Sequence, residues 1–215
     1  MDLVLIRHPA VAVPAGVCYG RSDVPLAADP DAAAADIAGR LAALRAPLPQ
    51  RVVTSPLVRC ARVAAALADA HGLGVQHDAR LAEIDFGDWE LCAWDAIGRE
   101  RVDAWAADFL HAREHGGESV AQFDARVQAA FDALADDAPE GSRVAWAVTH
   151  SGVMRAIAAR ALGVPLVRCM RWPLEMAAIV WLRRDAAGGA SGPDGPDGKE
   201  GAERASDWRL VRWNV

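Results

Sequence analysis

Short apolar runs that alternate with helical segments constrain the fold of this chain most strongly. Six segments have the length and apolar character of strands: 3–6, 51–54, 75–81, 143–148, 176–182 and 208–213. Between several of them lie segments with helical patterning, at 32–44, 55–71, 118–135 and 151–163. This alternation predicts the α/β class, with a three-layer α/β/α arrangement and a mostly parallel central sheet.

Two segments depart from the alternation. Residues 94–115 have helical patterning but few long apolar runs, so we expect a helical lid insertion there. Residues 186–206 are rich in Gly, Pro, Asp and Ser, a composition typical of a flexible connector. We find no internal repeat. A length of 215 residues then predicts a single domain over 1–215.

Three of the predicted strands end in polar residues of one kind. The first ends in Arg7-His8, and the fourth is followed by His150. The second leads into a helix that Ser55 is predicted to cap, with Arg59 in its first turn. Ligands of open α/β sheets bind at the carboxyl ends of the strands, where helix N-termini also favour anions. Because arginine binds phosphate oxygens well, the sequence predicts a phosphate pocket at this edge.

Composition narrows the function classes. Lys and Arg total 23 against 29 Asp and Glu, a formal net charge of −6, which argues against binding to nucleic acid or to anionic membranes. No segment reaches the roughly 18 apolar residues of a membrane span, and the N-terminus has no targeting pattern, so we expect a cytoplasmic protein. The oligomeric state stays open between monomer and homodimer. Four widely spaced cysteines predict free thiols and no zinc site: Cys18, Cys60, Cys92 and Cys169.

Motifs along almost the whole chain resemble the histidine phosphatase superfamily, also called phosphoglycerate mutase-like. The segments that carry the resemblance are Leu5-Ile6-Arg7-His8, Gly20 to Leu26, Ser55 to Arg62, Leu81 to Glu90, Gly116 to Ser119 and Val148 to Gly152. Each pattern is weak alone, and their common order makes the resemblance strong.

The resemblance implies a phosphatase that works through a phosphohistidine. His8 would be the nucleophile, and Arg7, Arg59 and His150 would hold the phosphoryl oxygens. Glu83 would protonate the leaving group and then activate water. Attack requires a neutral imidazole, and we expect the two arginines to lower the pKa of His8. These residues supply the chemistry without a cofactor or metal.

Departures from the family pattern leave a non-enzyme alternative open. Pro9 stands where the family has glycine, which removes one N–H next to the nucleophile. A module that binds a phosphorylated ligand with little turnover is therefore the alternative from another class. Glu83 argues against it, because an acidic side chain next to a phosphate dianion weakens binding and serves only catalysis.

The substrate branch is predicted from the loop 18–26. This loop most resembles the α-ribazole-5′-phosphate phosphatase branch, which implies a small-molecule phosphomonoester as substrate. Substrate contacts are expected from Tyr19, Gly20 and Arg21, and from Ser151 at the start of the last helix. A broad-range phosphatase and a phosphoglycerate mutase-like enzyme remain the alternatives within the superfamily.

Two further groups have competing interpretations. His111 and His115 lie four residues apart, as zinc ligands on one helix face would, but a solvated helix end is the simpler interpretation. Trp89, Trp94 and Trp105 flank or lie within the predicted lid. They could stack on a substrate ring, although core packing is more common for such residues.

Overall fold

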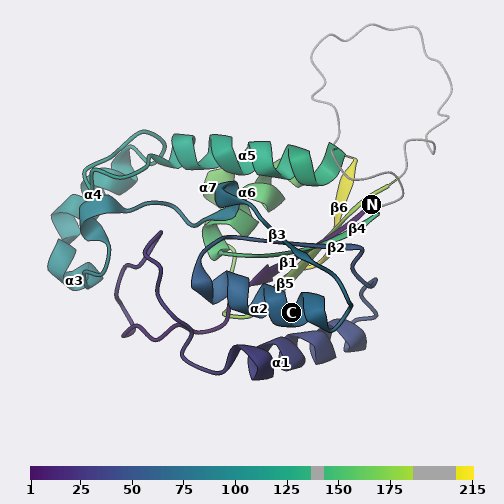
Figure 1. Ribbon diagram of the computed structural model, residues 1–215. Coiled ribbons are helices and arrows are strands. Elements are labelled where there is room, and N and C mark those ends of the chain that lie inside the picture. The colour runs from purple at the N-terminus through teal and green to yellow at the C-terminus, as the bar shows by residue number, and fades with distance from the viewer. Residues whose placement is uncertain (137–142, 186–206) are drawn as a thin grey trace, which may run out of the picture.

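A mixed sheet forms the centre of the protein in the computed structural model, which describes residues 1–136, 143–185 and 207–215 (Figure 1). The described strands are β1 (Asp2–Arg7), β2 (Arg51–Thr54), β3 (Val75–His77), β4 (Val144–Thr149), β5 (Ile179–Arg184) and β6 (Trp208–Arg212). Their order in the sheet is β3-β2-β4-β1-β5-β6. The pairs β3–β2, β2–β4 and β4–β1 are parallel, while β1–β5 and β5–β6 are antiparallel. This confirms the predicted mostly parallel sheet.

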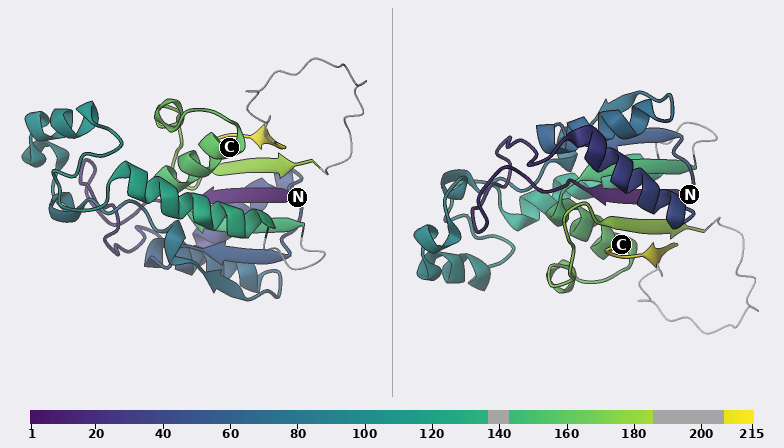
Figure 2. Two further views of the ribbon diagram at one scale, coloured as in Figure 1. Left: turned by 90° about the horizontal axis from the view of Figure 1, so that it is seen from above. Right: turned by 90° about the horizontal axis from the view of Figure 1, so that it is seen from below.

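Helices cover both faces of the sheet (Figure 2). The described α-helices are α1 (Pro30–Ala43), α2 (Val58–Asp69), α3 (Trp94–Ile97), α4 (Arg99–Ala107), α5 (Val120–Asp136), α6 (Ser151–Ala161) and α7 (Leu166–Cys169). On β1, Leu3 and Leu5 belong to the core cluster under α5 and α6, whereas Val4 and Ile6 belong to the cluster under α1 and α2. Successive side chains of a strand point to opposite faces, so a strand buried on both sides needs an unbroken apolar run.

The parallel strands bring their carboxyl ends to one edge of the sheet. Arg7 pairs with Thr149, and Thr54 pairs with Val148 on the neighbouring strand. The residues that follow these three strands therefore meet at the same edge. Helices α3 and α4 lie beyond this edge, in the direction in which β1 points (Figure 2).

The expected N-terminal cap of α2 is wrong. The helix begins at Val58 with Leu57 in the capping position, and Ser55 Oγ only accepts a hydrogen bond from Leu57 N at 3.3 Å. The N–H of Val58 donates instead to Asp23 Oδ1 at 2.6 Å. A carboxylate from a distant loop thus satisfies the helix end and leaves the serine hydroxyl to other partners.

The predicted lid segment 94–115 is only partly helical, because α4 ends at Ala107. His115 lies outside any helix and is fully buried, with its Nδ1 accepting a hydrogen bond from Gly117 N at 3.0 Å. Its ring packs against the buried Trp89, with centroids 5.1 Å apart. The expectation of a solvated helix end is therefore wrong at His115, and the part of the chain described here holds no group of metal-ligating side chains.

Two further predictions concern the cysteine thiols and membrane-spanning segments. All four cysteines are free thiols. In the described ranges no helix combines the length and apolar character that crossing a membrane requires. The predicted connector 186–206 lies outside the described residues.

Candidate active site

His8 follows β1 directly and is held on both sides of its backbone. Its N–H donates to Thr149 O at 2.9 Å, and its carbonyl accepts from Ala177 N at 3.1 Å. Its ring Nδ1 lies 2.7 Å from Pro9 O. A carbonyl can only accept, so Nδ1 carries the proton and Nε2 has a lone pair. The side chain is 2% exposed, and no hydrogen bond to Nε2 is found among the described residues.

Burial is the main cause that keeps the His8 imidazole neutral. The pKa of His8 is lowered to about 3 in total: burial lowers it most, the hydrogen bond to Pro9 opposes this, and the charges of Arg59 and Arg7 add to the lowering. The expectation that the arginines lower this pKa is confirmed in direction, although desolvation contributes more than they do. A neutral imidazole with one free nitrogen is the form a nucleophile requires.

Arg59 projects from the first turn of α2 and is fully buried. Its guanidinium donates to Gly20 O and to Ser22 O, at 2.6 Å each, and lies 5.2 Å from the ring centroid of Tyr19. Its Nε has no partner among the described residues. Arg59 thus fixes the 19–22 loop against the floor of the site and retains one donor group.

His150 lies between β4 and α6 and is also fully buried. Its Nε2 is 2.8 Å from Ser55 Oγ, and its ring centroid is 5.2 Å from that of His8. Burial, then the charge of Arg59, lowers the pKa of His150 well below its usual range. Both histidines are therefore neutral, and the positive charge of this edge comes from the arginines alone.

Glu83 reaches the site from the segment that follows the short helix η1 (Ala79–Leu81). Its Oε2 accepts from Gly152 N at 3.1 Å and lies 3.5 Å from Ser151 Oγ, both at the N-terminus of α6. Its Oε1 accepts from Ile84 N at 3.2 Å. The helix end and these donors orient the carboxyl group while leaving it at the surface of a pocket.

A pocket of about 220 Å³ brings these residues together. Of the predicted site residues, Arg7, His8, Tyr19, Gly20, Glu83 and Ser151 line it. Arg59 and His150 are fully buried and are not among the lining residues, and neither is Arg21. The remaining lining residues are Val17, Cys18, Ile84, Phe86, Trp94, Gly152 and Met170.

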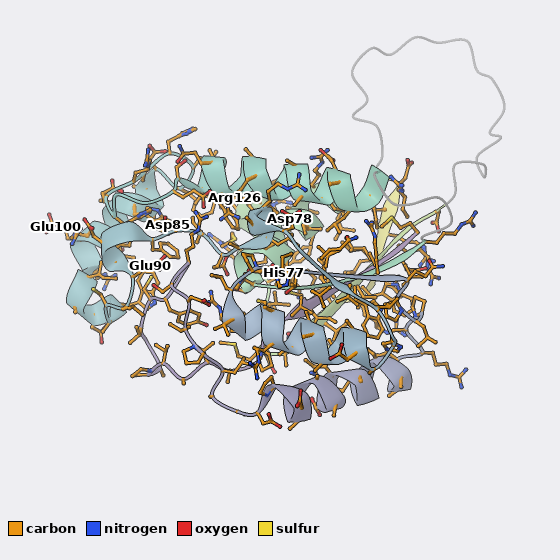
Figure 3. The ribbon with its side chains drawn as sticks, viewed as in Figure 1. His77, Asp78, Asp85, Glu90, Glu100 and Arg126 are labelled. Carbon is orange, nitrogen blue, oxygen red and sulfur yellow. The ribbon has the colours of Figure 1, made fainter. Side chains whose placement is uncertain are left out.

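Glu90 holds the loop at Arg21 and Ser22 beside this pocket, a role that was not predicted from the sequence. Glu90 accepts hydrogen bonds from Arg21 N at 2.7 Å, Phe86 N at 3.0 Å and the hydroxyl of Ser22. A Cβ on Gly20 would lie 2.6 Å from Glu90 Oε1, so only glycine lets the loop approach this closely. Figure 3 labels Glu90 near the end of the molecule that carries α3 and α4. The sequence feature that could have identified Glu90 is its position at the end of the segment Phe86 to Glu90, which carries part of the family resemblance.

Known proteins with similar sequences and folds include both mutases and phosphatases. A Yersinia enterocolitica protein named "Probable phosphoglycerate mutase GpmB" is 30% identical over 170 residues, covering 77% of this chain and 76% of its own length. The alpha-ribazole phosphatase of Shigella flexneri has a TM-score of 0.76 and 25% identity, with 86% of this chain and 92% of that chain covered. A mycobacterial glucosyl-3-phosphoglycerate phosphatase has a TM-score of 0.73 and 25% identity, covering 100% of this chain and 98% of that one.

The family itself follows from a match along most of the sequence. The sequence profile of the histidine phosphatase superfamily (branch 1) matches residues 3–191. This range contains most of β1 and the following His8, α2 with Arg59, the Glu83 segment and the β4–α6 junction with His150. The chain is therefore a member of the histidine phosphatase superfamily.

Proposed function

We propose that this protein is a metal-independent phosphomonoesterase that acts through a phosphohistidine formed on His8. The observation that carries the proposal is the state of the His8 ring: neutral, protonated on Nδ1 by the contact with Pro9 O, and free at Nε2 in a pocket shared with Arg7 and Glu83. A buried, oriented and uncharged imidazole next to guanidinium groups suits attack on a phosphoryl group.

In the first step, His8 Nε2 attacks phosphorus and the bond from phosphorus to the ester oxygen breaks. The alkoxide takes a proton from the Glu83 carboxyl, and the alcohol leaves. Arg7 and Arg59 each have a buried Nε without a partner in the described part of the chain, which supports a role in holding the phosphoryl oxygens. His150, being neutral, would contribute an N–H donor rather than charge.

In the second step, water attacks the phosphohistidine and the bond from phosphorus to Nε2 breaks. Glu83, now a carboxylate, takes a proton from this water, so that inorganic phosphate and the starting enzyme result. Glu83 next to the pocket is the observation that favours turnover over a binding module, since a carboxylate near a dianion costs binding energy.

The pocket walls favour a substrate with an uncharged, ring-bearing body. Beyond Arg7, the residues that line the pocket carry no lysine or arginine, and many are apolar or aromatic, among them Phe86, Trp94 and Met170. Such walls gain from contact with a ring and offer no cationic side chain besides Arg7 for a carboxylate on the substrate. Within the superfamily this supports α-ribazole 5′-phosphate over a phosphoglycerate. A cytoplasmic location stays a prediction.

Two assays test the proposal. The first measures phosphate release in EDTA from α-ribazole 5′-phosphate, 3-phosphoglycerate and p-nitrophenyl phosphate, with wild type, His8→Ala and Glu83→Gln. We expect His8→Ala to lose at least about 1,000-fold in rate and Glu83→Gln to lose about 100-fold or more on alkyl esters. The second traps the phosphoenzyme formed from a substrate with a radiolabelled phosphoryl group. Its label should survive alkali, be released by acid, and be absent from His8→Ala.

The outcomes separate the alternatives. A strong preference for α-ribazole 5′-phosphate would establish the ring-bearing substrate, and equal rates across the panel would indicate a broad-range phosphatase. Conversion of 3-phosphoglycerate to its isomer without phosphate release would indicate a mutase. Equal rates in wild type, His8→Ala and Glu83→Gln would refute the mechanism.

A further inference from the structure

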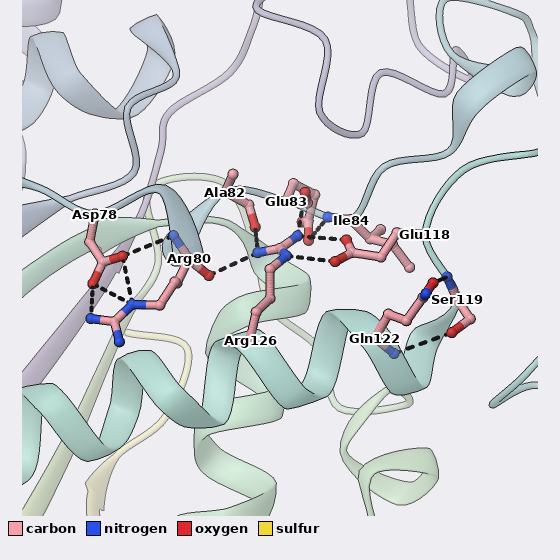
Figure 4. A network of polar contacts seen from close by, with 9 residues as sticks. All are labelled: Asp78, Arg80, Ala82, Glu83, Ile84, Glu118, Ser119, Gln122 and Arg126. Atoms are coloured by element: carbon pink, nitrogen blue, oxygen red, sulfur yellow. Dashed lines mark hydrogen bonds and ion pairs between the residues drawn. The ribbon is translucent and has the colours of Figure 1, made fainter.

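Arg126, on α5 and outside the pocket, contacts the segment that carries Glu83 with its whole guanidinium group (Figure 4). Nη1 donates to Arg80 O at 2.8 Å and to Ala82 O at 2.7 Å, while Nη2 donates to Glu83 O at 3.0 Å. Nε and Nη2 also donate to Glu118, at 2.7 and 2.8 Å. These contacts use all five N–H donors of the side chain.

The segment 80–83 depends on these contacts because none of the six described strands pairs with it. Arg126 binds the carbonyls of residues 80, 82 and 83, and the hydroxyl of Thr149 donates to Leu81 O at 2.8 Å. Side chains thus satisfy four consecutive carbonyls that a sheet would otherwise pair. Thr149 is the residue before His150, so the same segment is tied to the edge of the sheet where the site lies.

The ion pair with Glu118 keeps the Arg126 guanidinium in place. Both side chains are mostly buried, at 18% and 15% exposed, and the pairing is bidentate. Glu118 is itself anchored, since its backbone N–H donates to Asp85 O at 2.9 Å. At the start of α5, Ser119 and Gln122 cap the helix reciprocally, which fixes the direction of the helix that carries Arg126.

We propose that Arg126 is a positioning residue for the general acid: paired with Glu118, it holds the backbone of residues 80–83 so that the Glu83 carboxyl faces the leaving group. The inference rests on the proposed role of Glu83. Arg126 acts through hydrogen bonds to the main chain and contributes no proton of its own. Lysine, with three donors and no planar fork, cannot make the same set of contacts.

The dependence of rate on the leaving group distinguishes positioning from general structural support. An alkoxide needs a proton as it departs, whereas p-nitrophenolate leaves without one. Loss of acid catalysis therefore lowers kcat/KM for an alkyl phosphate much more than for p-nitrophenyl phosphate. We therefore use the ratio of kcat/KM for the alkyl phosphate to kcat/KM for p-nitrophenyl phosphate. This ratio does not depend on the fraction of enzyme that is folded, so it can also be measured in a destabilised variant.

The experiment compares this ratio in wild type, Arg126→Gln, Arg126→Lys, Glu83→Gln and the double variant Glu83→Gln/Arg126→Gln. Arg160→Gln is the matched control. Arg160 lies on α6 and pairs at 2.6 Å with Asp132 on α5, the helix that carries Arg126, and this ion pair does not involve residues 80–83. We expect Arg126→Gln to lower the ratio about 10- to 100-fold, from a carboxyl displaced by about 1 Å. Arg126→Lys should lower it by a similar factor, and Arg160→Gln should leave it unchanged. The double variant should show no lower ratio than Glu83→Gln alone.

Two results would overturn the inference, and they differ. If Glu83→Gln lowers the ratio but Arg126→Gln lowers both rates equally, Arg126 supports the fold only, and the proposed function stands. If Glu83→Gln itself leaves the ratio unchanged, Glu83 is not the acid, and the proposed mechanism fails together with this inference.

Discussion

Because Gly152 contacts Glu83, we predict that Gly152→Ala lowers the catalytic rate much more than it lowers the stability of the fold. Gly152 lies in the first turn of α6 and donates its N–H to Glu83 Oε2 at 3.1 Å. A Cβ at this position would overlap Glu83 Oε1 and would lie 3.2 Å from both Glu83 Cδ and Phe123 Cζ. The backbone of Gly152 is helical, so alanine is accepted there without strain. The substitution therefore acts on the carboxyl group rather than on the helix.

The expected magnitude follows from how far the carboxyl must move. To reach ordinary contact distance, the Glu83 carboxyl has to retreat by about 1 Å, and a displacement of this size costs roughly 100-fold in rate. The loss in stability is smaller, because the end of a glutamate side chain can rotate away and alanine favours the helix by about 1 kcal/mol over glycine. We expect the free energy of unfolding to change by less than about 1 kcal/mol.

Initial rates on an alkyl phosphate and urea unfolding curves check both halves of this prediction. Gly39→Ala is the matched control: Gly39 lies in α1, and a Cβ there meets no atom within 4 Å. It should raise stability by about 0.5–1 kcal/mol and leave activity unchanged. If Gly152→Ala kept more than half of the wild-type rate, the orientation of Glu83 by α6 would not matter for catalysis. A loss of several kcal/mol with proportional loss of activity would show that the clash is absorbed by the core instead.

Three further predictions follow from the site. The folded-state pKa of His8 is about 3, below its unfolded value of 6.5, so the neutral ring stabilises the fold above pH 6.5 and this contribution is lost as pH falls toward 3. In urea unfolding between pH 6.5 and 5, wild type should lose about 2 kcal/mol more of its free energy of unfolding than His8→Ala. Parallel pH curves for the two proteins would contradict this prediction. Glu90→Gln should raise KM roughly 10-fold, since it weakens charge-assisted hydrogen bonds that hold the loop at Ser22. An unchanged KM would show that these hydrogen bonds are not needed to hold the loop for substrate binding. Asp23→Ala should cost about 1 kcal/mol in unfolding free energy, because Asp23 caps the N–H of Val58, and equal stability by thermal unfolding would contradict it.

The edge of the sheet that holds the site could be predicted because strand geometry is local. An apolar run such as 3–6 identifies a strand buried on both faces, and parallel strands must present their carboxyl ends together. The observed register of Arg7 with Thr149 is the consequence. Residues placed by such rules, His8 and His150, are found where the sequence puts them, with ring centroids 5.2 Å apart.

Predictions failed where a distant residue outcompeted a local signal. Ser55 has the residue type and spacing of a helix cap, but Asp23, 35 residues away from Val58, takes the first helical N–H. Ser55 is then free to bind His150 through its hydroxyl. The prediction for His115 failed for a related reason. The local pattern favoured a solvated position, whereas aromatic rings from another part of the chain bury this side chain.

Glu83 differs from the other proposed catalytic groups in what positions it. His8 and His150 follow strands, so hydrogen bonds of the sheet fix their backbone, and substitutions elsewhere can move them only by disturbing the sheet. Glu83 follows a short 3-10 helix whose carbonyls bind side chains, above all Arg126, 43 residues further along the chain. Sequence motifs identify such an acid but not its supports. We therefore expect substitutions outside the pocket to affect proton transfer to the leaving group before they affect phosphoryl attack by His8.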